Sequence, residues 1–160
     1  MTKTLALTQR QTYAWSALFI AANIALPHLF HLIPSGGVMF LPIYFFTLIG
    51  AMRYGWQLGL LTAVMTPIMG NLIFGAPAAA MIPDMLLKGA ALSLVGAAVA
   101  RKWGRSLVCC TGAVVAAFAI VGLIELPFCG AGVAFQDFVT GLPGMAMMTL
   151  GAWLTSKYIK

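Results

Sequence analysis

Long apolar stretches occupy most of this chain, and its few charged side chains stand mainly at the ends of those stretches. Of the 160 residues, 62% are hydrophobic and only 8% are charged. A soluble domain of this length needs a larger share of polar residues, because they must cover its exterior. We therefore expect an all-α integral membrane protein that forms one transmembrane domain over residues 1–160.

Six stretches are suited to crossing a bilayer, which takes about 20 mostly apolar residues and fewer where the membrane is thin. They run from Gln11 to Leu26, Val38 to Arg53, Gly55 to Gly70, Ala80 to Ala100, Ser106 to Phe128 and Thr140 to Ser156. Only Arg53, Tyr54 and Gly55 separate the second stretch from the third. One helix over residues 38–70 is too long for a single crossing, so we predict a tight hairpin there.

The basic residues orient this six-helix bundle. Eight of the nine fall on one side of it: Lys3, Arg10, Arg53, Arg101, Lys102, Arg105, Lys157 and Lys160. The opposite connections, residues 28–37, 71–79 and 129–139, contain neither Lys nor Arg. The positive-inside rule predicts that the basic side, with both termini, is cytoplasmic. The net charge of +6 thus reflects topology, and we expect no nucleic-acid partner.

All eight prolines lie in the opposite connections or in the outer halves of the helices. Proline removes a backbone donor and bends a helix, and in lipid the freed carbonyl groups need partners from protein or water. We expect an irregular outer half of the bundle that encloses a polar cavity, and a more regular inner half.

The ninth basic residue, Lys88, lies inside the fourth stretch, about 12 Å below its outer end at 1.5 Å per residue. Asp84 precedes it by one helical turn on the same face, and Glu125 is its natural second partner. A lone lysine at this depth costs on the order of 3 kcal/mol, so Lys88 should face the bundle interior. A structural ion-pair cluster is one interpretation. We favour a ligand site, because buried ionisable groups in membranes more often line a path or a site.

Three further residues complete the predicted substrate site. Asn71 and Phe74 lie in the second outer connection, which is placed to close over a ligand, and Tyr44 offers a ring that stacks on a flat molecule. Asp137, in the third outer connection, is interpreted as part of an ordinary solvated turn. His28 and His31 lack a third ligand, so we expect no metal site.

Small residues repeat every four positions on two of the helices. On the first helix these residues are Ala17, Ala21 and Ala25, and on the fourth they are Gly89, Ser93 and Ala97. Such stripes let another helix approach closely. The first stripe contacts either a partner protein or a helix of this chain, and we expect the second stripe to be used internally.

Several sequence blocks have the order and spacing of a known family: Pro34-Ser35-Gly36-Gly37, Leu41-Pro42-Ile43, Gly55, Gly59, Phe74-Gly75-Ala76-Pro77, Gly89 and Gly96. With them, the chain resembles the substrate-binding S components of energy-coupling factor transporters. These are small bacterial membrane proteins that capture vitamins and related micronutrients. The Ala17, Ala21, Ala25 stripe looks like the family's alanine motif.

The resemblance implies a multi-pass protein of a prokaryotic plasma membrane that holds a vitamin-like molecule near the outer face. It also implies a transmembrane coupling subunit, which contacts the alanine motif, and two ATP-hydrolysing subunits. This chain has no phosphate-cradling Gly-Lys-Ser/Thr loop, so we expect neither a cofactor nor an enzyme activity of its own. A nickel or cobalt substrate is disfavoured, because the metal-binding members begin Met-His whereas this chain begins Met1-Thr2.

In the leading hypothesis, Lys88 meets a carboxylate, phosphate or carbonyl of the ligand, while Asp84 and Glu125 orient it or pair with a ligand amine. A stand-alone ion-coupled carrier or channel is the main alternative, with the same three residues as a proton relay. A membrane enzyme or an assembly protein is a third possibility.

Overall fold

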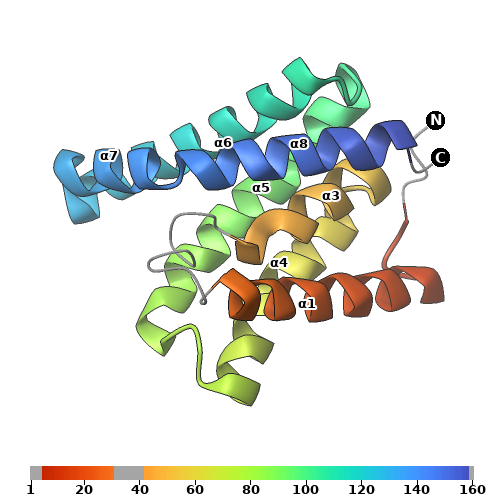
Figure 1. The fold of residues 1–160 in the computed structure, drawn as a ribbon, viewed down its shortest axis with the longest axis horizontal. Helices are drawn as coiled ribbons and strands as arrows, with labels where there is room; N and C mark the ends of the chain where they lie inside the picture. Colours follow the sequence, from red (N-terminus) through yellow and green to blue (C-terminus); the bar gives the residue numbers. More distant parts are fainter. Residues whose placement is uncertain (1–4, 31–41, 159–160) are drawn as a thin grey trace.

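The computed structural model describes residues 5–30 and 42–158, which fold as a bundle of helices joined by short turns (Figure 1). In chain order the elements are α1 (Arg10–Phe30), η1 (Pro42–Tyr44), α3 (Phe45–Tyr54), α4 (Trp56–Phe74), η2 (Ala79–Met81), α5 (Ile82–Lys102), α6 (Leu107–Cys129), α7 (Ala131–Thr140) and α8 (Leu142–Tyr158). The described residues contain no β-strand. The predicted all-α fold is therefore confirmed.

Within residues 5–30 and 42–158, three helical segments are long and apolar enough to cross a membrane. They are Trp56–Phe74, Ala79–Lys102 and Leu107–Phe128. Many large apolar side chains of these segments are exposed, including Leu94 of α5 and Val108 and Leu123 of α6. Exposed apolar faces of this kind suit a lipid surrounding better than water.

Helix α3 lies at the centre of the bundle, between α1, α4, α5 and α8 (Figure 1). Its Leu48 and Met52 are fully buried, and they belong to one hydrophobic core with Leu58 of α4, Leu92 of α5 and Met148 of α8. The second predicted span thus provides the centre of the core.

The predicted hairpin between the second and third stretches is present, and a single residue forms it. Helix α3 ends at Tyr54, α4 begins at Trp56, and Gly55 between them has a φ of 102°. Only glycine adopts this conformation without strain. A Cβ atom on Gly59 would lie 2.5 Å from the Cβ of Ala51, so the absence of a side chain lets the two helices pack closely.

A buried polar network fastens α1 to the core. Asn23 is completely buried, and its Nδ2 donates to the hydroxyl of Thr47 at 3.1 Å and, more weakly, to that of Thr66 at 3.5 Å. Its Oδ1 accepts from the backbone N–H of Phe46 at 3.0 Å, in the first turn of α3. Asn23 thus stabilises the start of α3 from another helix, where α3 has no side-chain cap of its own.

One prediction about the fold is wrong. The third outer connection, predicted as a loop over residues 129–139, forms helix α7. Gly130, with a φ of 80°, ends α6 and starts α7, and no proline interrupts the ten residues that follow. The predicted start of the second span, and with it His31, the block Pro34-Ser35-Gly36-Gly37 and Leu41, lies outside the described residues.

Apart from Lys88, the basic residues that the structure describes gather at one end of the bundle, hereafter the basic end. It comprises the start of α1, the α3–α4 turn, the α5–α6 turn and the end of α8, which lie together at the right of Figure 1. The Nη1 atom of Arg53 donates to the carbonyl oxygen of Thr155 at 3.1 Å, and the N–H of Leu5 donates to that of Tyr54 at 2.8 Å. The first and last residues that the structure describes therefore lie at the same end of the bundle.

Candidate functional site

The three acidic residues of the chain surround one lysine. Lys88, on α5, places its Nζ atom 2.8 Å from Oδ2 of Asp84 and 2.8 Å from Oδ2 of Asp137, and 3.6 Å from Oε1 of Glu125. The partners come from α5, α7 and α6 respectively. We call these four side chains the Lys88 cluster.

Burial within the cluster is uneven. Lys88 is 8% exposed as a residue, whereas the side chains of Asp84 and Asp137 are 42% and 53% exposed. The Glu125 side chain, at 16%, lies deeper. The ammonium group is thus enclosed, while two of its carboxylate partners open toward the surroundings. This geometry gives a molecule from outside access to negatively charged oxygen atoms without exposing the lysine.

The cluster carries more negative than positive charge. With all four groups ionised its formal charge is −2, because three carboxylates face one ammonium. Oδ1 of Asp84 and Oε1 of Glu125 are buried and accept no hydrogen bond from any described residue. Buried carboxylate oxygens need donors to offset their lost hydration. The excess of carboxylates, two of them half-exposed, is suited to attract a ligand that brings donors and positive charge.

Tyr44 lies near the cluster, on the side of the hydrophobic core. Tyr44, in η1, is 4% exposed, and it packs in the hydrophobic core. It lies close enough to Asp84, Glu125 and Asp137 to interact electrostatically with each of them. Because so little of its ring is accessible, stacking on a ligand would require η1 to move.

Two predictions about the cluster are confirmed and one is wrong. Lys88 faces the bundle interior and pairs with Asp84 one turn earlier, and Glu125 is close to both. Asp137 is not part of a solvated turn, since it forms a 2.8 Å ion pair with Lys88. The segment's helical structure was missed, and α7 carries Asp137 back over the end of α6.

Asn71 and Phe74 were also predicted to belong to the substrate site, but their contacts lie elsewhere in the structure. Asn71 lies within α4, and its Nδ2 donates to the carbonyl oxygen of Pro77 at 2.7 Å, so it closes the turn that follows the helix. Phe74, the last residue of α4, lines a groove between α4 and α1. The structure thus gives both residues positions unrelated to the Lys88 contacts.

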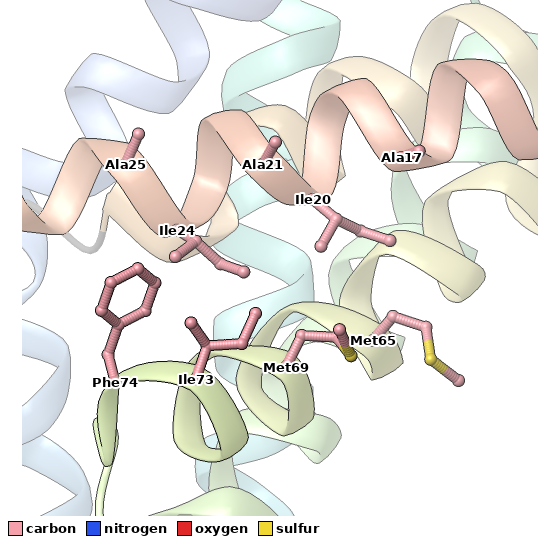
Figure 2. A pocket seen from close by; sticks show the side chains of 9 residues that line it. All are labelled: Ala17, Ile20, Ala21, Ile24, Ala25, Met65, Met69, Ile73 and Phe74. Carbon is pink, nitrogen blue, oxygen red and sulfur yellow. The ribbon is translucent and has the colours of Figure 1, made fainter.

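The groove between α1 and α4 is almost wholly apolar and has a volume of about 840 Å³. Nine side chains line it (Figure 2): Ala17, Ile20, Ala21, Ile24, Ala25, Met65, Met69, Ile73 and Phe74. In Figure 2, Ile20 and Ile24 point from α1 toward the side chains of α4. The three alanines of the predicted stripe are all exposed, and none of the described helices covers them.

The second small-residue stripe is used inside the chain, as expected. Gly89 and Ser93 are buried, and a Cβ atom on Gly89 would lie 2.9 Å from the Cβ of Ala63 on α4. The two stripes therefore differ in their surroundings, although they have the same spacing. The stripe on α5 packs that helix against α4, whereas the stripe on α1 is exposed and lines the groove.

No protein family, curated protein or solved structure was found to match this chain.

Within the part of the chain that the structure describes, no group of three or more His, Cys, Asp or Glu side chains is placed to hold a metal ion.

Proposed function

We propose that this chain is a membrane-embedded substrate-capture subunit, with six spans and cytoplasmic termini, that works with a separate coupling subunit and two ATPase subunits. It binds a small vitamin-like organic molecule at the Lys88 cluster. The observation that carries the proposal is the gathering of all three acidic side chains around one buried lysine, on helices α5, α6 and α7 toward the end of the bundle opposite the basic end (Figure 1). Charges inside a membrane protein are costly and mark functional sites.

The cluster favours a ligand with a cationic group. Two carboxylates already hold the Lys88 ammonium at 2.8 Å, so little of its charge remains for a ligand anion. This differs from the expectation that Lys88 itself meets a ligand carboxylate or phosphate. A ligand amine or ring cation would instead approach the half-exposed carboxylates of Asp84 and Asp137, with the Glu125 carboxylate behind them.

Ligand binding is tested first with purified protein. Native mass spectrometry of the gently purified chain should show a retained small molecule, and titration should show that organic cations bind more tightly than anions of similar size. Glu125→Gln should weaken binding at least tenfold, because the cation loses a charged partner. Gln136→Leu on the exposed surface of α7 is the matched control and should bind normally. Unchanged affinity in Glu125→Gln would exclude this site.

The partnership is tested separately on the groove. Ala21 is exposed and lines the groove, so Ala21→Phe should abolish copurification with the coupling subunit and leave ligand affinity unchanged. Leu18→Phe is the control, since Leu18 is 55% exposed on the same helix but does not line the groove. Equal copurification of both variants would argue against docking at the groove.

An ion-coupled carrier is a second candidate, because Oδ1 of Asp84 and Oε1 of Glu125, which accept no hydrogen bond from the described residues, are also suited to accepting a proton. This alternative predicts uptake by the chain alone in proteoliposomes, and that uptake should collapse with an uncoupler. The capture subunit should instead show no net uptake without its ATPase partners.

A further inference from the structure

Aromatic side chains accompany the positive charges at the basic end. All four tryptophans of the chain lie at or near the segments that form it: Trp15 in α1, Trp56 at the start of α4, Trp103 in the α5–α6 turn and Trp153 in α8. Three of the four tyrosines accompany them: Tyr13 near the start of α1, Tyr54 at the end of α3 and Tyr158 at the end of α8. The rings of Trp15 and Tyr54 stack at 5.3 Å, which joins α1 to the α3–α4 turn. Tryptophan and tyrosine concentrate at membrane interfaces, where one edge of the ring is in apolar surroundings and the other is hydrated.

In the part of the chain that the structure describes, Arg101, Lys102, Arg105 and Lys157 form no ion pair with an acidic side chain. The three carboxylate side chains are all held at Lys88, toward the other end of α6. Arg101, Lys102 and Lys157 are exposed, and Arg105 is half-buried. An unneutralised group of cations on one surface attracts anions from outside.

Two of the exposed cations lie over tryptophan rings. Nζ of Lys102 is 4.6 Å from the ring centroid of Trp103, and Nζ of Lys157 is 5.0 Å from that of Trp153. Trp103 is itself 63% exposed. An apolar ring that carries an ammonium group at its surface matches the boundary between acyl chains and phosphate headgroups.

We propose that the basic end binds the phosphate groups of anionic phospholipids, with the α5–α6 turn as the principal contact. Arg101, Lys102 and Arg105 all belong to the five-residue segment 101–105 at this turn. Trp103, between them, anchors the turn at the interface. Arg53 is not part of the contact, because its guanidinium group is engaged with Thr155. The proposal rests on the membrane placement in the proposed function, but it does not depend on the ligand or on the partner subunits.

The expected strength follows from the charges. Each Lys or Arg near an anionic membrane surface contributes about a fivefold gain in affinity, so the three residues of the turn together contribute about 100-fold. Salt should reduce the gain, because exposed charges are screened beyond about 10 Å at 0.1 M ionic strength.

The test compares two lipids that differ only in headgroup. The protein in neutral detergent is mixed with equal amounts of phosphatidylglycerol and phosphatidylcholine with identical acyl chains, and native mass spectrometry measures the bound ratio. We expect phosphatidylglycerol to be preferred at least tenfold. The triple variant R101Q/K102Q/R105Q should bring the ratio close to one. The matched control R101K/R105K, which keeps the charge, should retain the preference.

Equal binding of the two lipids by the native chain would overturn the proposal, as would a preference that survives in the triple variant. If the triple variant does not fold, raising the salt concentration on the native chain provides the same test, and a salt-independent ratio would also overturn it. The triple variant could instead lose copurification with the ATPase subunits while its lipid ratio stays the same as that of the native chain. That result would assign the basic end to a protein partner and would refute lipid binding.

Glu125→Gln should keep the lipid preference whether or not it loses its ligand. Failure of the ligand proposal and failure of the lipid proposal are therefore read from different variants.

Discussion

Replacing Lys88 with methionine is expected to lower the free energy of unfolding by about 3 kcal/mol. At an effective dielectric constant of about 20, each 2.8 Å contact of the ammonium contributes about 6 kcal/mol of attraction, and the 3.6 Å contact about 5 kcal/mol. Desolvation of the lysine and mutual repulsion of the carboxylates offset most of this. Half-exposed Asp84 and Asp137 are also screened by their surroundings, so the lower end of the range for a broken buried pair applies.

Thermal unfolding in detergent measures this loss. For a chain of this length, 1 kcal/mol corresponds to about 2–4 °C, so Lys88→Met should unfold about 6–12 °C below the native protein. Adding Asp84→Asn to Lys88→Met should recover part of the loss, because it removes one of the three unneutralised carboxylates. Lys157→Met is the charge-matched control and should cost no more than about 1 kcal/mol, the value of its contact with Trp153.

A fall of less than about 2 °C in Lys88→Met would refute this reasoning. It would mean that the three carboxylates are stable without the ammonium, and that the short contacts contribute no net stability.

Two more substitutions test the packing of the bundle. Asn23→Leu should cost about 2–3 kcal/mol in thermal unfolding, because the part-buried N–H of Phe46 loses its acceptor; a neutral result would show that α3 does not need this bond. Gly59→Ala should cost about 1–3 kcal/mol, since the new Cβ meets Ala51 at 2.5 Å. Gly112→Ala is its control on α6, where nothing lies within 4 Å, and it should be neutral or stabilising by about 1 kcal/mol. Equal effects of the two glycine substitutions would contradict the close approach of α3 and α4.

The sequence predicted the elements that depend on local patterns. Gly55 could be identified as a turn because a helix through it would be too long for one crossing, and the Asp84 and Lys88 pair follows from helical periodicity. Asp137 is 49 residues away from Lys88 in the sequence, and only the packing of α7 on α6 brings it there. No local pattern carries that information.

Asn23 was missed for a different reason. It stands within an apolar stretch that was interpreted by its alanines, although a polar amide at that depth is expensive unless it is fully bonded. The energetic cost of burying this amide was the one sign in the sequence that Asn23 has hydrogen-bond partners. The spacing of residues on α1 could not identify those partners, which lie on α3 and α4.

The separation of charge along α6 makes the molecule an electric dipole. Arg105 just before the helix and Glu125 near its end are twenty residues apart, or about 30 Å at 1.5 Å per residue. Moving one elementary charge across the membrane changes the energy by about 2.3 kcal/mol for each 100 mV of membrane potential. In the proposed orientation, an interior-negative voltage would hold the basic end inward and resist any motion that lays the bundle flat. The resting potential of the cell would then stabilise the upright state of this protein, and depolarisation would lower the energy of tilting it.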